Sequence, residues 1–191
     1  RNSDVRNKGT YYFASRAERK QKKRYASRRG PRKFTDEMKE KAEKMAKNWL
    51  DNAFNGKYSY LSFSKEGWSQ KYNLVWDKLF GTDLMPKTVL ESEFASYAKH
   101  INAYGLPLDS RSDYTKSDWI MWTATMSPDD DTFRKFVIPV YNYINETTSR
   151  VPISDWSDTK TGKMVGFKAR SVIGGYWMKV FADKLAAQQK K

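Results

Sequence analysis

Acidic side chains stand beside tryptophan and basic side chains at several places in this 191-residue sequence. The acidic residues are Asp109, Asp118 and Asp155, and the basic and aromatic residues near them in the chain are Arg111, Lys116, Trp119, Trp156 and Arg170. Two carboxylates that face one substrate can perform hydrolysis, because one activates a water molecule and the other protonates the leaving group. We therefore predict a hydrolytic site in which the three aspartates are catalytic.

The basic and aromatic residues fit the same site as substrate-binding groups. Arg111 and Arg170 can each hold a substrate carboxylate through two parallel hydrogen bonds, or can pair with the aspartates. Tryptophan beside carboxylates suits a sugar ring or a small polar molecule in a cleft. Lys116, Trp119 and Trp156 complete the predicted binding set.

The candidate residues also have alternative roles. Asp118 stands in a Ser-Asp-Trp triplet and could cap the helix that follows, while Ser154 and Asp155, in a second such triplet, could form a turn. A different chemistry is conceivable in "YTKSD", where the hydroxyl of Thr115 or Ser117 lies beside a lysine and an aspartate and could act as a nucleophile for amide hydrolysis.

The composition restricts metal chemistry. The chain has no cysteine and one histidine, His100, so thiolate sites and multi-histidine sites are excluded, and we expect no metal ion. His100 falls within a predicted helix, away from the long loops, where we expect a structural role.

Six helices are predicted from the spacing of apolar residues. They span about residues 35–54, 69–80, 87–104, 116–126, 129–146 and 172–188. Gly81 and Gly105 are expected to end the second and third helices, and Pro139 to kink the fifth. Residues 57–64 alternate in polarity and predict a short strand. The expected fold class is all-α, built of antiparallel helical hairpins with one short β-like segment.

The lengths of the connections alternate. The connections at about residues 55–68, 105–115 and 147–171 are long, while those at 81–86 and 127–128 are short. Consecutive packed helices run antiparallel, so alternate connections fall at the same end of the helices. The three long connections should therefore form one composite polar and aromatic face, and loops on a rigid scaffold are where binding sites usually lie.

The positive charge is concentrated near the N-terminus. The net charge is +14, but residues 1–33 alone contain 13 Lys and Arg against two Asp and Glu. This basic arm, which we separate from a domain at residues 34–191, could bind nucleic acid or membrane phosphates, or could be a solvated tail. No apolar run is long enough for a membrane span, and no signal peptide is visible.

Several long motifs resemble the C-terminal part of the glutaminase A family. They are "WSQKYNLVWDKLFG", "YGLPLDSRSDYTKSDWIMWTA", "NETTSRVPISDW" and "DTKTGKMVGFKARSVIGGYW", and the resemblance covers about residues 36–182. It implies an (α/α)6 toroid of the six-hairpin glycosidase type, of which this chain would form about half. The implied activity is hydrolysis of L-glutamine to L-glutamate and ammonia without a metal or organic cofactor. Seven of the candidate residues match family motif positions, namely Asp109, Arg111, Lys116, Asp118, Trp119, Asp155 and Arg170.

The resemblance further implies that family members are larger, extracellular or cell-surface proteins with β-rich domains and earlier hairpins before this region. The chain is therefore expected to be a fragment whose partner is the missing half of the toroid, and its activity alone is left open. Residues 1–33 do not resemble the family and could be translated from a wrong frame. The alternatives to a glutaminase are hydrolysis of a glycoside by the same fold, and an inactive helical domain with a nucleic-acid-binding arm.

Overall fold

The structure is a computed structural model that describes residues 36–189. The basic arm at residues 1–33 lies outside the described residues. The chain divides into two units, Arg1–Lys41 and Ala42–Lys191. Of the first unit the structure describes only the start of helix α2 (Asp36–Ala53), where the Lys41 ammonium donates to the Glu37 carboxylate at 2.6 Å. Everything that follows concerns the second unit.

The six predicted helices are confirmed, although some of their boundaries differ. After α2 come α3 (Val75–Phe80), α4 (Lys87–Tyr97), α5 (Ser117–Thr125), α6 (Asp130–Glu146) and α7 (Met178–Gln189), and short 3-10 segments, η1 (Tyr72–Leu74) and η2 (Ser171–Trp177), lead into α3 and α7. Gly81 ends α3 in a left-handed conformation with φ 60°, as predicted. Helix α6 continues through Pro139.

The third helix is shorter than the sequence predicts. It ends at Tyr97 and not at Gly105. Beyond Tyr97 the backbone forms tight turns, because the segment is bound to a distant part of the chain. The Tyr104 N–H donates to the Thr159 carbonyl at 2.9 Å, and the Asn102 side chain donates to the Thr159 hydroxyl at 2.9 Å. Long-range pairing therefore overrides the local helical pattern here.

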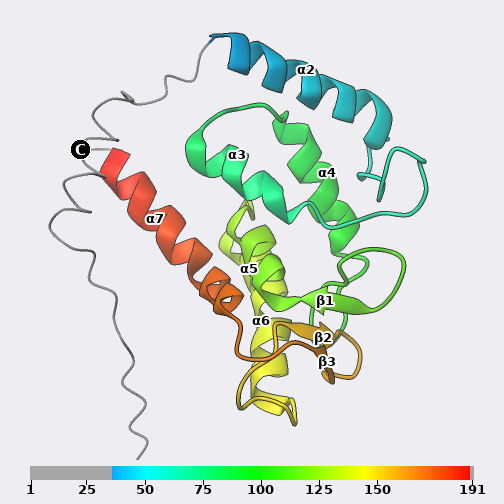
Figure 1. Ribbon diagram of the computed structural model, residues 1–191, viewed down its shortest axis with the longest axis vertical. Coiled ribbons are helices and arrows are strands. Elements are labelled where there is room, and N and C mark those ends of the chain that lie inside the picture. Colours follow the sequence, from blue (N-terminus) through cyan, green and yellow to red (C-terminus); the bar gives the residue numbers. More distant parts are fainter. Residues whose placement is uncertain (1–35, 190–191) are drawn as a thin grey trace, which may run out of the picture. The chain divides into compact units, whose positions relative to one another are not determined.

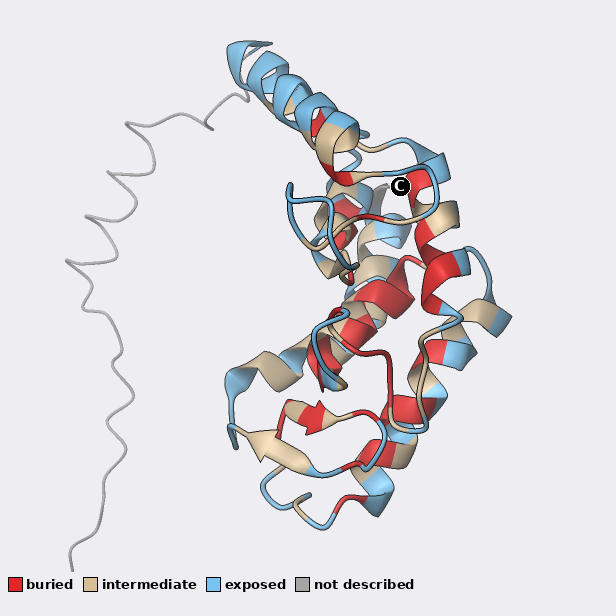
Figure 2. Cartoon of the chain, turned by 90° about the vertical axis from the view of Figure 1, so that its right-hand side faces the viewer, coloured by how far each residue is buried: buried red, intermediate tan, exposed pale blue. Residues whose placement is uncertain are grey.

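Helix α5 lies at the centre of the helical part. Figure 1 shows it between α7 on one side and α3 and α4 on the other, with α6 running beneath it. Its sequence, SDWIMWTAT, is apolar on most sides, which is typical of a helix that is surrounded by others. Ile120 and Ala124 are fully buried, and Phe136 and Val140 of α6 pack into the same core. The buried positions run through this region in Figure 2.

The predicted strand at residues 57–64 is wrong. The structure has only an isolated bridge there, between Phe54 and Ser59, because the Ser59 N–H donates to the Glu93 carboxylate and not to a strand partner. A small antiparallel sheet forms elsewhere, in the order β1 (Tyr114–Lys116), β2 (Trp156–Asp158) and β3 (Met164–Gly166). The fold is therefore mostly helical with a three-stranded sheet, and not all-α.

The three long connections meet, as the alternation of their lengths predicts. The Ser110 N–H donates to the Trp68 carbonyl at 3.0 Å, which joins the first long connection to the second. The Thr159 N–H donates to the Asp113 carbonyl at 2.9 Å, which joins the second to the third. The sheet belongs to this assembly, since β1 is in the second connection and β2 and β3 are in the third.

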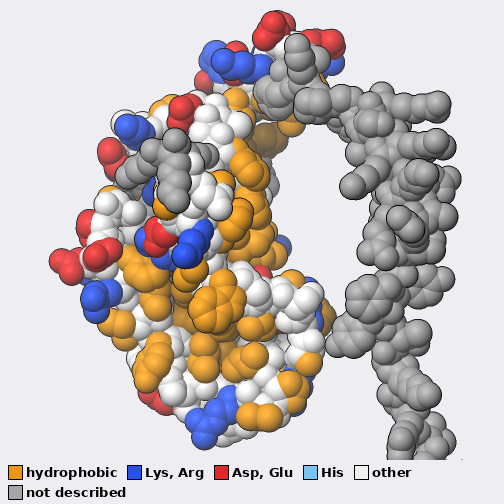
Figure 3. Space-filling model, turned by 90° about the vertical axis from the view of Figure 1, so that its left-hand side faces the viewer, with side chains coloured by type: hydrophobic (Ala, Val, Ile, Leu, Met, Phe, Trp, Pro, Cys, Tyr) orange, Lys and Arg blue, Asp and Glu red, His pale blue; other side chains and the backbone are white. Residues whose placement is uncertain are grey.

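Apolar side chains are exposed on α7 and at its start. Trp177, Val180 and Phe181 are 70%, 49% and 48% exposed. Helix α7 is on the side of the molecule that Figure 3 presents, and hydrophobic side chains gather on that side. Exposed apolar surface of this kind often marks a contact surface. No helix among residues 36–189 is long and apolar enough to cross a bilayer.

A buried carboxylate joins the first long connection to α4. Glu93 is 1% exposed, and its Oε1 accepts hydrogen bonds from both the backbone N–H and the hydroxyl of Ser59. Burial raises the pKa of Glu93, although the donors on Ser59 and Tyr97 act to lower it. The carboxyl group therefore positions Ser59 at the cost of burying an ionisable group.

Two substitutions of Glu93 should separate the benefit of its hydrogen bonds with Ser59 from the cost of burying its charge. Glu93→Gln keeps an acceptor for Ser59 and removes the charge, while Glu93→Ala leaves the Ser59 donors buried and unpaired. Since the pKa of Glu93 is raised in the folded state, the free energy of unfolding of the wild-type protein falls as the pH rises from the unfolded pKa of Glu93 through its folded pKa. We expect Glu93→Ala to cost about 3 kcal/mol, and Glu93→Gln to gain stability relative to wild type as the pH rises above the unfolded pKa of a glutamate. Urea denaturation measures both, and equal losses in the two variants would contradict this role.

Candidate functional site

The two Ser-Asp-Trp triplets lie side by side. In the β1–β2 pair, Lys116 is opposite Trp156, and the Ser117 N–H donates to the Asp155 carbonyl at 2.9 Å. Because the strands pair, Ser117 and Asp118, which follow β1, lie close to Asp155, which precedes β2. As a result, the negative charge of Asp155 is close enough to Asp118 to raise its pKa.

Asp155 is a buried carboxylate that contacts two cations. It is 1% exposed, and its Oδ2 accepts from Lys116 Nζ at 3.0 Å and from Arg170 Nη1 at 3.3 Å. A buried carboxylate needs such partners, since desolvation otherwise penalises its charge. The predicted turn is formed by Ser154, whose hydroxyl accepts from the Trp156 N–H at 3.0 Å, and Asp155 faces the cations.

Asp118 lies in the first turn of α5 and is 3% exposed. Burial raises its pKa to about 6, its own N–H acts to lower it, and the charge of Asp155 raises it further. Lys116, and not Asp118, occupies the N-cap position, so the capping prediction is wrong. A carboxyl group that titrates near pH 6 can both accept and donate a proton close to neutral pH.

Aromatic rings surround these charges. Trp119 stacks on Tyr72 with ring centroids 4.0 Å apart, and Trp156 packs against Phe167 at 5.2 Å. The Lys116 ammonium lies 4.2 Å from the centre of the Phe167 ring and 4.9 Å from that of Trp156. These distances permit cation–π attraction, which helps to hold the ammonium in place.

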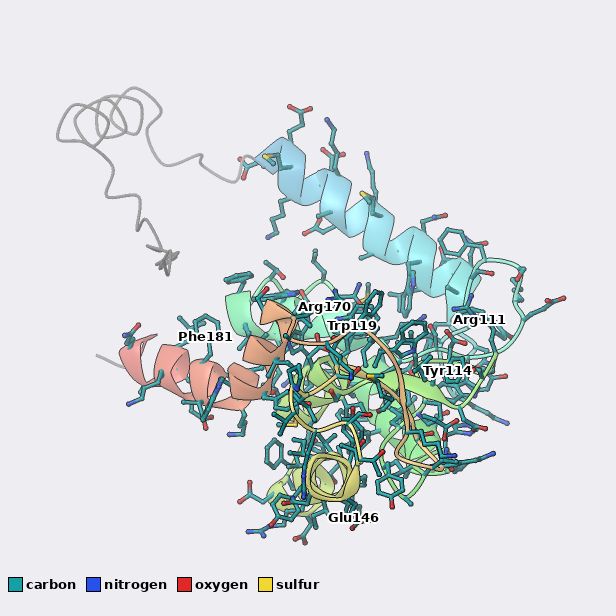
Figure 4. The ribbon with its side chains drawn as sticks, turned by 60° about the horizontal axis from the view of Figure 1, so that its bottom comes forward. Arg111, Tyr114, Trp119, Glu146, Arg170 and Phe181 are labelled. Atoms are coloured by element: carbon teal, nitrogen blue, oxygen red, sulfur yellow. The ribbon has the colours of Figure 1, made fainter. Side chains whose placement is uncertain are left out.

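A pocket of about 470 Å³ opens beside this cluster. It is lined by Leu108, Asp109, Arg111, Ser112, Tyr114, Thr115, Lys116, Trp119, Trp156 and Phe167. In the view of Figure 4, Trp119 and Arg170 are drawn in one area, and Arg111 and Tyr114, which line the pocket, are drawn farther along. The structure therefore groups Asp118, Asp155, Lys116 and Arg170 in one cluster, with Trp119 and Trp156 on the pocket wall.

Asp109 and Arg111 form a separate pair at the edge of the same pocket. Asp109 is 5% exposed, and it accepts from Arg111 Nε at 2.9 Å and Nη2 at 2.7 Å. Burial acts to raise the pKa of Asp109, but the hydrogen bonds and charge of Arg111 outweigh it, and the pKa is lowered. Both carboxylate oxygens of Asp109 therefore accept hydrogen bonds from the guanidinium of Arg111, which is two residues farther along the chain.

Two further predictions meet different outcomes. The Ser117 hydroxyl contacts the Tyr176 hydroxyl at 2.7 Å and the Asp155 carbonyl at 3.3 Å, so neither contact supplies the base that a nucleophilic serine needs.

The predicted placement of His100 away from the loops is wrong, because its ring stacks on Trp68 in the first long connection, with centroids 4.3 Å apart. The early end of α4 explains this.

Sequence reasoning missed Tyr72, Phe167 and Tyr176. Burial raises the pKa of Tyr176 to about 12, and its hydroxyl is in contact with Ser117, next to both carboxylates. Phe167 lies in "VGFKAR", one of the resembling motifs, and this was the available signal. Within residues 36–189, no group of three or more His, Asp and Glu side chains could hold a metal ion.

Comparison with known proteins identifies the class to which this helical fold belongs. Residues 24–180 match the family described as the glutaminase A six helical-hairpin domain, and the chain belongs to this family. The match begins within the basic arm.

Two known proteins are similar to the chain in sequence. Glutaminase A of Aspergillus oryzae (strain ATCC 42149 / RIB 40) is 36% identical over 109 residues, which cover 54% of this chain and 15% of that protein. A protein of Arthroderma benhamiae (strain ATCC MYA-4681 / CBS 112371) named probable glutaminase/05536 is 36% identical over 107 residues, which cover 54% of this chain and 12% of that protein. No solved structure matches the chain at a significant level.

The opposite pKa shifts of Asp118 and Asp109 should appear in the pH dependence of stability. Because the pKa of folded Asp118 is raised, its contribution is present below its unfolded pKa and is lost as the pH rises through about 6. Asp118→Asn should therefore gain about 2 kcal/mol relative to wild type between about pH 4 and pH 8.

Asp109→Asn is the matched control. Since the pKa of Asp109 is lowered, its contribution is present at neutral pH and is lost as the pH falls through the folded pKa. Asp109→Asn should thus be less stable than wild type at neutral pH and should approach it in acid. Urea denaturation at several pH values measures both differences, and slopes of the same sign would contradict the electrostatic assignment.

Proposed function

We propose that the site hydrolyses the side-chain amide of L-glutamine to L-glutamate and ammonia. The observation that carries this proposal is the closeness of Asp118, whose pKa is raised to about 6, to the cation-bound Asp155. Two carboxylates in different environments are the usual arrangement for acid and base chemistry at one site. Membership of the glutaminase A family supports the choice of an amide substrate.

In the proposed reaction Asp118 is the general base and then the general acid. Its carboxylate takes a proton from water while the water oxygen bonds to the amide carbon. The same proton then passes to the amide nitrogen as the carbon–nitrogen bond breaks, which releases ammonia and leaves a carboxylic acid. The acid then loses its remaining proton to solvent and becomes the carboxylate of glutamate. Asp155 keeps Lys116 and Arg170 in position, and its charge raises the basicity of Asp118.

Arg170 is the proposed binding group for the α-carboxylate of the substrate. Asp155 Oδ2 accepts from both Lys116 and Arg170, so this cluster has one cation more than Asp155 alone can balance. The Arg170 side chain is 40% exposed, and its guanidinium lies 4.4 Å from the Phe167 ring. Arg111, in contrast, is already balanced by Asp109. Trp119 and Trp156 would form the walls of the binding pocket.

We also propose that the chain forms about half of an (α/α)6 toroid. The exposed apolar side chains of α7 and the small share of each relative that the chain covers support this arrangement. Further hairpins would then cover α7, and an extracellular location remains a prediction from the family. The boundary of a domain at residue 34 also remains a prediction.

A glycoside is the second candidate substrate, because the pocket is lined by Trp119, Trp156 and Tyr114, and aromatic faces suit sugar rings. Incubation with glutamine and with a panel of glycosides separates the two candidates by their products, ammonia and reducing sugar. Release of reducing sugar without ammonia would show that the substrate is a glycoside and not an amide. If neither product is released, both candidate substrates are overturned.

Asp118→Asn should reduce ammonia release from glutamine about 100-fold or more, because an amide group cannot carry the proton. The control is Asp183→Asn on α7, which removes only a surface pair with Lys179 and should leave the rate unchanged. The assay is the initial rate of ammonia release by the chain. A near-normal rate for Asp118→Asn would remove this residue from the mechanism.

Arg170→Gln should raise the KM for glutamine at least about tenfold with a smaller change in kcat, since the guanidinium binds a part of the substrate that does not react. Arg111→Gln is the comparison, because its guanidinium is already paired with Asp109. We expect a smaller rise in KM for it. Steady-state kinetics of both variants decide the assignment, which fails when Arg111→Gln shows the larger effect.

A further inference from the structure

Five buried polar atoms of the described residues in and beside the site have no hydrogen-bond partner within the protein. Two are the hydroxyl oxygens of Thr115 and Ser157 in the β1–β2 pair, and the other three are Asp118 Oδ1, Asp155 Oδ1 and Trp122 Nε1. Each belongs to a group that strongly favours a partner, because leaving a buried donor or acceptor unpaired costs about 1–3 kcal/mol. Three such atoms in one region therefore require an explanation.

The packing places the three side chains together. Asp118 and Trp122 are four residues apart on α5 and so lie on the same face of the helix. Both face Gly175 of η2, where an added Cβ would lie 2.7 Å from Trp122 Nε1 and 3.0 Å from the Asp118 Cβ. Asp155 reaches the same region, since its carbonyl accepts from Ser117 and its charge acts on Asp118.

We propose that Asp118 Oδ1, Asp155 Oδ1 and Trp122 Nε1 together bind one water molecule, and that this water is the nucleophile of the hydrolysis. An indole N–H can only donate a hydrogen bond, and a carboxylate oxygen can only accept one. A water molecule accepts from the indole and donates one proton to each carboxylate. Buried waters typically make about three such bonds.

Other occupants match these atoms less well. A cation would meet the positive end of the indole N–H, and Lys116 and Arg170 already provide positive charge at Asp155. A proton shared by the two carboxylates would satisfy their oxygens but would leave the Trp122 N–H unpaired. Water is the ligand that satisfies one donor and two acceptors together.

The catalytic part of this inference rests on the proposed function. The bound water would transfer a proton to Asp118 Oδ1 as its oxygen bonds to the amide carbon, and that proton would then go to the leaving nitrogen. Trp122 would orient the water lone pair that is not used in the attack. Substitution of Trp122 would then lower kcat with little change in KM, by roughly 100-fold when the water is displaced by about 1 Å.

The test is an NMR measurement on the chain without substrate. Cross-relaxation between water and the indole Hε1 of Trp122 should have the sign of a long-lived bound water, while that of Trp177, which is 70% exposed, should have the sign of surface water. In Trp122→Phe, the carboxyl ¹³C titration of Asp118 should shift to higher pH, because its anion loses an ordered hydrogen-bond donor. Trp76→Phe is the matched control, since its ring packs edge-to-face on Trp122 at 5.2 Å and its indole is outside the three-atom set.

The absence of a long-lived water at Trp122 Hε1 in the wild-type chain, or an Asp118 titration that is the same in Trp122→Phe and wild type, would overturn the water site. Parallel assays of ammonia release keep the two proposals apart. A long-lived water without hydrolysis of glutamine would support the water site and overturn the proposed function. Hydrolysis of glutamine without such a water would overturn the water site alone.

Discussion

The site depends on the burial of two carboxylates next to one another. Asp118 and Asp155 are 3% and 1% exposed, and two like charges in such a place oppose each other and lose their hydration. The two carboxylates differ in their partners. Asp155 contacts Lys116 and Arg170, while Asp118 contacts neither and titrates near pH 6. The Phe167 and Trp156 rings lie against Lys116, whose side chain is 14% exposed, so its ion pair with Asp155 is largely shielded from bulk solvent and the attraction is strengthened.

The helices and the sheet make distinct contributions to this arrangement. Helix α5 fixes Asp118 and Trp122 on one face, and its apolar core residues anchor it against α6. The β1–β2 pair brings Asp155 to that helix. Gly175 allows η2 to approach α5 closely, because any larger residue would overlap the indole of Trp122. The motif "VIGGYW" is thus a packing feature that lies directly against the proposed site.

The sequence predicts the helices well and the site in part. Apolar spacing is strong in α5 and α6, where tertiary packing and local preference agree. The early end of α4 and the position of His100 could not be predicted, because they depend on hydrogen bonds between Asn102, Tyr104 and the distant Thr159. The sheet was missed because each strand has only three residues, which is too short for an alternating pattern. The grouping of Asp118 with Asp155, and the separation of Asp109 from both, follow from this unpredicted sheet.

The sheet also has a consequence for the order of folding. Helices α5 and α6 are neighbours in the chain and can associate early, because the loop between them is short. The pairing of Thr115 with Ser157 instead joins segments about forty residues apart, and closing a loop of that length has an entropic cost that local contacts do not have. Asp118 would therefore spend the early stages of folding exposed to water as an ordinary, acidic surface residue. Its unusual proton affinity would arise only when the third long connection docks, so the chemistry of the site would be acquired in the last steps of folding.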